Sequence, residues 1–149
     1  MRRISGLHLL VDGFVRDPVT LEPGNICDLF DKLVDALNMK YLMHPVAMRV
    51  PLDPNKLQTD DDEGGWSVIC QITTSHLSLH GWPARGAFML DAFSCCQFNT
   101  EKAKQIIYNH LGVSEANVQV ITRSGPKIKN KPISKKYLAK AEEIYPPAA

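Results

Sequence analysis

The chain begins with the pattern of a strand followed by a helix. Residues 7–11 are mostly apolar and lie between Gly6 and Gly13, which predicts a short buried strand. A Pro-Gly pair then breaks the chain at 23–24, and Asn25 is placed to cap a helix with its side-chain oxygen. Apolar residues recur at helical spacing after this point, at Ile26, Leu29, Phe30, Leu33, Val34 and Leu37. The pattern predicts an amphipathic helix.

The middle of the chain changes to the pattern of strands. Residues 41–50 are a mixed apolar run that ends at Pro51. After Gly64-Gly65, residues 66–74 are rich in Val, Ile and Thr, and Leu77 and Leu79 then alternate with polar residues. A further apolar segment covers 87–93. These segments predict successive strands.

A second helix and a last strand complete the pattern. Asn99 or Thr100 can cap a helix that Gly112 ends, with apolar positions at Ala103, Ile106, Ile107 and Leu111. Val118, Val120 and Thr122 follow as a strand. The order of strand, helix, strands, helix and strand predicts an α+β domain of two layers, without sequence repeats.

Two charged segments lie outside this pattern. The acidic run at 60–63 is typical of a solvated loop, because its residues are consecutive and lack the spacing of a calcium-binding loop. We therefore expect no metal site. The chain is basic beyond Pro126, so we divide it into a domain at 1–125 and a basic tail at 126–149. Helical spacing between Tyr137 and Tyr145 favours a short docked helix or a solvated tail over a nucleic-acid patch.

Composition narrows the class of protein further. A chain of 149 residues can bury the core of one compact domain, and a net charge of +1 gives no field that favours nucleic acid or a membrane. The first residues lack the long apolar run of a secretory signal or membrane span, which makes the cytoplasm the expected location. The four cysteines have neither CxxC nor zinc-ligand spacing. Cys27 and Cys70 are interpreted as reduced, small apolar residues.

Chemically active side chains are concentrated between Ser67 and Cys95. The segment TSHLSLHGWP covers 74–83, and LDAFSC covers 90–95. Together they place hydroxyls, imidazoles and a thiol on neighbouring strands. From the residues alone, ordinary sheet positions are favoured, and His8 is interpreted as a hydrogen-bonded strand histidine.

The same two segments resemble the signature of the S-adenosylmethionine decarboxylase family. In that family a Ser-His-(apolar)-x-(apolar)-His-x-Trp/Tyr-Pro stretch precedes an Asp-x-(aromatic)-x-Cys segment. Gly6-Leu7-His8 and the Gly-rich approach to Ser67 are also similar, and the resemblance runs from about Gly6 to the last strand. It implies the family fold, a two-layer sandwich with an antiparallel sheet and helices on one face.

The resemblance also implies a reaction of the protein with itself. Ser75 would attack the carbonyl of Thr74, and the chain would break between these two residues. A pyruvoyl group derived from Ser75 would remain at the new N-terminus. Such a ketone can form a Schiff base with a substrate amine and act as an electron sink.

Three further residues match family residues with assigned roles. His80 matches the histidine that assists processing, and Ser67 matches a serine that supports the same cleavage. Cys95 matches the thiol that returns a proton to the substrate. Cys96 is expected to face the other way in a strand. The resemblance further implies a homodimer with its active site near the subunit interface.

Three positions depart from the family pattern. Thr74 stands where glutamate is common, which we expect to affect the rate of cleavage. Ala84 stands where the family has a glutamate that holds the ribose hydroxyls of S-adenosylmethionine, and Gly81 replaces a threonine. The family default predicts S-adenosylmethionine as the substrate, whereas the lost ribose contact is what a switch to a smaller amino acid, such as arginine or ornithine, would predict. A non-catalytic homologue is the remaining alternative.

Overall fold

The computed structural model describes residues 3–51, 64–127 and 134–145. The predicted acidic loop at 60–63 lies outside these residues. The strands are β1 (Arg3–Val15), β2 (Tyr41–Val50), β3 (Gly65–Ile72), β4 (Ser75–Trp82), β5 (Ala87–Ser94) and β6 (Val113–Lys127). The helices are α1 (Pro23–Ala36), α2 (Thr100–Leu111) and α3 (Lys135–Ile144), with 3-10 turns η1 (Pro18–Leu21) and η3 (Pro83–Arg85).

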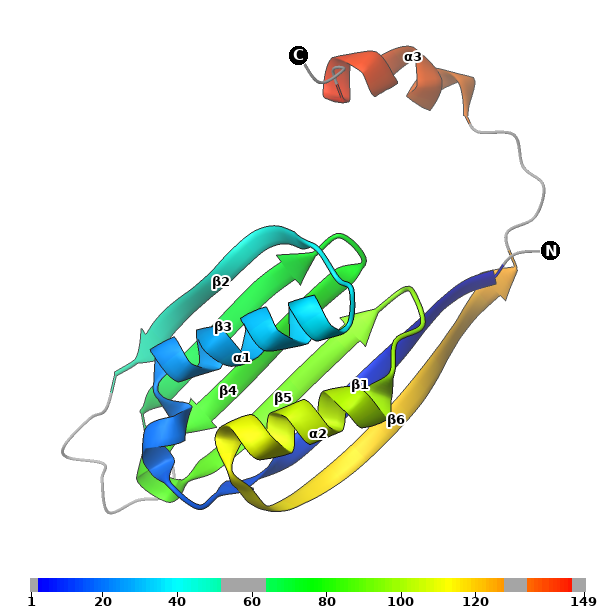
Figure 1. Ribbon diagram of the computed structural model, residues 1–149. Helices are drawn as coiled ribbons and strands as arrows, with labels where there is room; N and C mark the ends of the chain where they lie inside the picture. Colours follow the sequence, from blue (N-terminus) through cyan, green and yellow to red (C-terminus); the bar gives the residue numbers. More distant parts are fainter. Residues whose placement is uncertain (1–2, 52–63, 128–133, 146–149) are drawn as a thin grey trace.

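The six strands form one sheet in the order β2-β3-β4-β5-β1-β6, and all neighbours are antiparallel. Helices α1 and α2 lie side by side across one face of this sheet (Figure 1). The predicted α+β class and two-layer sandwich are therefore confirmed.

The core lies between the sheet and these two helices. In β3, β4 and β5 every second residue is buried, at Val68, Cys70, Ile72, Leu77, Leu79, Phe88, Leu90 and Ala92. The predicted stripe of α1 packs on them, and its residues from Ile26 to Val34 are buried. Burial of each large apolar side chain contributes about 1.5–3 kcal/mol relative to exposure. This core fixes the register of the sheet, because a shift by one residue would turn apolar side chains outward.

Two local predictions for the first part of the chain are wrong in detail. The first strand runs from Arg3 to Val15, and Leu10 alternates away from the core instead of being buried with its neighbours. Helix α1 begins at Pro23, which suits the first helical position because it has no N–H to leave unpaired. Asn25 consequently lies inside the first turn, where its side-chain amide donates to the carbonyl of Thr20 at 2.8 Å.

The boundaries of α2 are confirmed. The side-chain oxygen of Asn99 accepts a hydrogen bond from the backbone N–H of Lys102 at 2.9 Å, which caps the helix. Gly112 ends it with a φ of 64°, a left-handed conformation that glycine adopts without steric cost. The chain then enters β6 directly.

The other face of the sheet is left open by the described elements (Figure 1). We call it the open face. Large apolar side chains on this face are 43–64% exposed, at Val46, Met48, Ile69, Met89 and Ile121. In the described part of the chain, no helix is long and apolar enough to cross a membrane.

Helix α3 forms within the basic tail, for which the sequence predicted either a short docked helix or a solvated tail. The hydroxyl of Ser134 caps its first turn by accepting from the N–H of Tyr137. Figure 1 shows α3 apart from the sheet and its two covering helices. The division of the chain at residue 125 stays a prediction.

Candidate functional site

The predicted cleavage point lies in the tight turn between β3 and β4. Strand β3 ends at Ile72 and β4 begins at Ser75, so Thr73 and Thr74 form the turn. The carbonyl oxygen of Thr74 accepts a hydrogen bond from the backbone N–H of Cys95 at 2.9 Å. The carbonyl that the family resemblance makes the target of Ser75 is thus polarised by a fixed backbone donor.

Ser75 has an unusual backbone conformation. Its φ is 156°, in a region where residues with a side chain are rare. Strained backbone of this kind costs about 1–3 kcal/mol and persists where the surrounding structure fixes it. Here Ser75 is paired on both sides, with Ile72 of β3 and Ser94 of β5. The strain adjoins the bond between Thr74 and Ser75.

The two neighbouring cysteines lie beyond the end of β5. The strand ends at Ser94, and the thiols of Cys95 and Cys96 are both exposed. The expectation that Cys96 faces the other way in a strand is therefore wrong, because strand alternation ends before it. The hydrogen bond from Cys95 to Thr74 brings Cys95 next to the turn, whereas Cys96 bonds through its N–H to the Ser94 hydroxyl.

Ser67 and His80 form a second cluster on the open face. They are direct partners in the pairing of β3 with β4, and the Ser67 hydroxyl lies 2.8 Å from Nδ1 of His80. The pairing explains the contact, since side chains of opposed residues in antiparallel strands lie on the same face. A serine that holds an imidazole in one orientation suits a proton-transfer role.

Within one chain the two clusters are separate. Ser75 begins β4 and His80 lies five residues further along the same strand. At 3.3 Å per residue the two Cα atoms are about 16 Å apart. The structure thus brings Thr74, Ser75 and Cys95 together, and brings Ser67 to His80, but it does not join these groups within one protomer.

Sequence reasoning missed Ser94. Its hydroxyl donates to Oγ1 of Thr74 at 2.9 Å, directly behind the turn. The signal was present, because Phe88, Leu90, Ala92 and Ser94 follow the two-residue period of the buried face. A serine at an inward position of a strand needs a partner.

The prediction for His8 is confirmed. Its Nε2 lies 2.7 Å from a carboxylate oxygen of Asp91 across the pairing of β1 with β5, and its ring meets Phe93 edge-on. Asp12 lies nearby on β1. Burial, followed by the negative charge of Asp91, raises the pKa of the Asp12 carboxyl. Asp91, which pairs with Leu10, thus lies between the His8 imidazole and the Asp12 carboxyl on the open face.

The comparison with families of known proteins gives a match over residues 7–124. The matching model is described as S-adenosylmethionine decarboxylase, and it covers most of the chain, including both clusters. The chain belongs to the S-adenosylmethionine decarboxylase family. The resemblance in the serine and cysteine segments is therefore confirmed at the level of the family.

Two individual proteins are similar to this family member. The S-adenosylmethionine decarboxylase proenzyme of Thermococcus kodakarensis is 35% identical over 60 residues, which cover 40% of this chain and 42% of that protein. The chain thus matches less than half the length of this relative. The crystal structure of the adenosylmethionine decarboxylase from Aquifex aeolicus has a TM-score of 0.62 at 19% identity, covering 89% of this chain and 100% of that one. This second likeness supports the fold.

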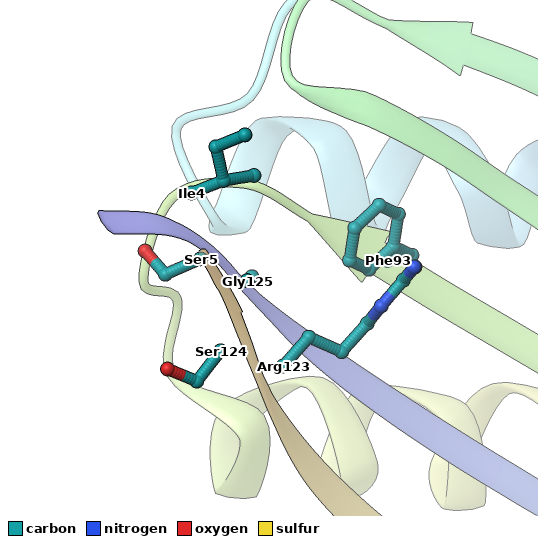
Figure 2. A pocket seen from close by; sticks show the side chains of 7 residues that line it. Ile4, Ser5, Phe93, Arg123, Ser124 and Gly125 are labelled. Atoms are coloured by element: carbon teal, nitrogen blue, oxygen red, sulfur yellow. The ribbon is translucent and has the colours of Figure 1, made fainter. Parts of the chain in front are cut away.

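A small pocket lies beside the open face, between the ends of β1, β5 and β6. It has a volume of about 230 Å³ and includes Ser5, Phe93, Arg123 and Ser124 in its lining. Figure 2 shows the Arg123 guanidinium beside the Phe93 ring, away from the two serine hydroxyls. The guanidinium carbon lies 4.5 Å from the ring centroid, the geometry of a cation–π contact.

A second cavity of about 270 Å³ lies behind the turn between β3 and β4. Thr74, Ser94 and Cys96 contribute to its lining. Cys70 is buried in the nearby core, and burial raises the pKa of its thiol to about 11. Cys70 is therefore a neutral thiol at physiological pH, in keeping with its interpretation as a small apolar residue. Among the described residues, no group of three or more His, Cys, Asp or Glu side chains could hold a metal ion.

Proposed function

We propose that this protein is a self-processing, pyruvoyl-dependent decarboxylase that acts on S-adenosylmethionine. The observation that carries the proposal is the hydrogen bond from the N–H of Cys95 to the carbonyl of Thr74, directly before the strained Ser75. It supplies a backbone donor at the oxygen that becomes negative when a hydroxyl attacks the carbonyl carbon. The family match supports the same reaction.

Processing would proceed in three stages. Oγ of Ser75 attacks the carbonyl carbon of Thr74, and the C–N bond breaks as the nitrogen takes up a proton, which leaves an ester and a free α-amine. A base then removes the Cα proton of Ser75, and the Cβ–Oγ bond breaks to release the Thr74 carboxylate. Water hydrolyses the resulting enamine, after its conversion to an imine, to a ketone and ammonia. The products are the fragments 1–74 and 75–149.

The residues around Ser75 fit the group that this sequence of steps produces. The new N-terminus would begin β4, held between β3 and β5 by the pairs of Ser75 with Ile72 and Ser94. When present, the pyruvoyl group supplies an electron sink for loss of carbon dioxide from an amino acid. The exposed thiol of Cys95 lies at the same turn, where it would return a proton to the substrate α-carbon.

We further propose that the working unit is a homodimer packed through the open face. His80 and Ser67 lie about 16 Å along the strand from Ser75 and cannot assist it within one chain. A two-fold axis that crosses β4 near Ser78 would place the β4 strands of two copies antiparallel. His80 of each copy would then lie opposite the Thr74–Ser75 end of β4 in the other copy, because a two-fold interface repeats each contact.

The open face has the composition that such packing requires. Its exposed apolar side chains include Ile69 and Met89, on the two strands that flank β4. Face-to-face sheets lie about 10 Å apart, which is within the combined reach of two inward-facing layers of side chains. Each dimer would contain two equivalent sites.

Ala84 and Gly81 bear on which substrate the protein binds, because both depart from the family pattern. Ala84 is exposed in the turn after β4 and offers no acceptor for the ribose hydroxyls. Loss of a charged hydrogen bond costs about 1.5–3 kcal/mol, so S-adenosylmethionine would bind more weakly than with glutamate there. The family match supports S-adenosylmethionine over arginine or ornithine as the substrate.

The test is the intact mass of the purified protein under denaturing conditions, followed by an assay of carbon dioxide release. We expect two fragments split between Thr74 and Ser75, the second with a pyruvoyl N-terminus, and release from S-adenosylmethionine above that from arginine or ornithine. A single uncut chain after long incubation would overturn the self-processing function. Release of carbon dioxide from arginine alone would overturn the proposal that S-adenosylmethionine is the substrate.

A further inference from the structure

Ser94 is a buried polar residue in an otherwise apolar layer. Its exposure is 1%, and among the residues that the structure describes no other polar or charged side chain is buried to this extent. It ends the inward-facing row of β5 that begins at Phe88 and continues through Leu90 and Ala92. Because burial of a hydroxyl without partners is unfavourable, its hydrogen bonds explain its place there.

The partners of Ser94 all belong to the cleavage turn and its support. The Ser94 hydroxyl donates to Oγ1 of Thr74 at 2.9 Å and accepts from the N–H of Cys96 at 3.0 Å. The residue between them, Cys95, donates through its N–H to the Thr74 carbonyl. Ser94 and Cys95 therefore hold Thr74 at two points, its side chain and its carbonyl oxygen, and the N–H of Cys96 in turn holds Ser94.

We propose that Ser94 is a positioning residue for self-cleavage. It fixes the side chain of Thr74 so that the carbonyl of Thr74 stays directed at the N–H of Cys95 while Ser75 attacks. The inference rests on the proposed cleavage between Thr74 and Ser75 and extends it to a residue outside the attacking and proton-transferring groups. The hydrogen bonds of the Ser94 hydroxyl join it to Thr74 and Cys96, so we assign its effect to the side chain of Thr74.

The side chain of Thr74 suits this arrangement. Threonine is branched at Cβ, so its χ1 angle has few allowed values, and an anchored hydroxyl restricts the backbone that follows it. The longer side chain of glutamate, common at this position in the family, would place its oxygens further from Cβ than the hydroxyl that Ser94 contacts. The contact between the two hydroxyls therefore depends on the threonine that this chain has at position 74.

The orientation of Thr74 matters for the turn before cleavage and not after it. Before cleavage, the orientation of Thr74 decides how well its carbonyl meets Ser75. After cleavage, Thr74 is the end of a separate fragment and no longer bonds to Ser75. Loss of the Ser94 hydroxyl should therefore slow the cleavage step itself.

The experiment follows cleavage of freshly made chain by denaturing mass spectrometry. The variants are Ser94→Ala, Thr74→Val, Thr74→Ser and the double variant Ser94→Ala/Thr74→Val. Thr20→Val is the matched control, since its hydroxyl donates to the carbonyl of Leu111 at 2.9 Å, away from the turn. We expect Ser94→Ala and Thr74→Val each to slow cleavage about 3- to 10-fold, the effect of one hydrogen bond.

The double variant should be no slower than the slower single variant, because both changes remove the same contact. Thr74→Ser keeps the hydroxyl and should cleave at close to the wild-type rate, and so should Thr20→Val. Thr74→Val is nearly isosteric, so it gives the result if Ser94→Ala does not fold.

The inference and the proposed function fail in different ways. A wild-type chain that never cleaves overturns the function. A wild-type chain that cleaves while Thr74→Val cleaves equally fast overturns the role of Ser94. Multiplied effects in the double variant, or a Thr74→Ser chain as slow as Thr74→Val, also overturn it, because they indicate a packing effect instead of a shared hydrogen bond.

Discussion

The backbone N–H of Cys95 donates to the carbonyl of Thr74 at 2.9 Å, so Cys95 contacts the proposed cleavage point through its main chain while its thiol is exposed. The main-chain contact survives any substitution that keeps an N–H, whereas the thiol does not. Cleavage and decarboxylation can thus be separated at one position.

Cys95→Ala should cleave at close to the wild-type rate but lose about 100-fold or more in product formation, the usual contribution of a positioned proton donor. Cleavage is measured by denaturing mass and product by release of carbon dioxide. Cys96→Ala is the matched control and should retain both steps. Full product formation by Cys95→Ala would show that the thiol takes no part in the reaction.

His80→Ala should stay uncut alone, because no second copy supplies the imidazole to Ser75. Mixed with Ser75→Ala during expression, the His80→Ala chain should be cut, since the Ser75→Ala chain provides His80 from across the interface. Mass spectrometry distinguishes the two chains. If the mixture stays wholly uncut while the wild type cleaves, the two-copy arrangement is wrong.

Ile69→Glu places a charge on the open face, on the strand beside β4, where Ile69 is 45% exposed. If the sheets pack face to face, the buried charge should weaken the dimer and reduce cleavage with it. Val19→Glu, at a 68% exposed position of η1, should change neither. Sedimentation at several concentrations measures the association, and a dimer that persists with Ile69→Glu would place the interface elsewhere.

Ala84→Glu restores the acceptor that the family pattern contains at this exposed turn. We expect the KM for S-adenosylmethionine to fall by about tenfold or more, as one charged hydrogen bond is worth about 1.5–3 kcal/mol. Ala84→Gln, which has similar size without the charge, is the control and should give a smaller change. An unchanged KM would mean that the nucleoside does not approach this turn.

Asp12→Asn should raise the melting temperature at pH 7. Burial and the charge of Asp91 raise the pKa of Asp12 in the folded protein, so its contribution to stability is present below the unfolded pKa and is lost as pH rises through the folded pKa. Asparagine imitates the neutral form, and the gain should therefore vanish by about pH 3.5, below the usual aspartate pKa. A lower melting temperature at pH 7 would reveal a cation that pairs with Asp12.

The sequence predicts the elements of this fold well because apolar spacing decides them. The stripe of α1, the caps at Asn99 and Gly112 and the alternation in β4 are all local patterns. Asn25 failed as a cap because a proline two residues earlier starts the helix first.

The site was only partly predictable. The family resemblance supplied Ser75, His80, Ser67 and Cys95, but not their distances from one another. The separation of Ser75 from His80 depends on both being in one regular strand, and the Ser94–Thr74 contact depends on the pairing of β4 with β5. Such relationships follow from register, which a single sequence does not contain.

The strand order has a consequence for the cut protein. A break between Thr74 and Ser75 would leave β1, β2 and β3 in one fragment and β4, β5 and β6 in the other. Strand β1 is hydrogen-bonded to β5 on one side and to β6 on the other, so a strand of the first fragment lies between two strands of the second. The two polypeptides would therefore unfold in one cooperative transition, and neither could dissociate without breaking the strand pairing of the sheet.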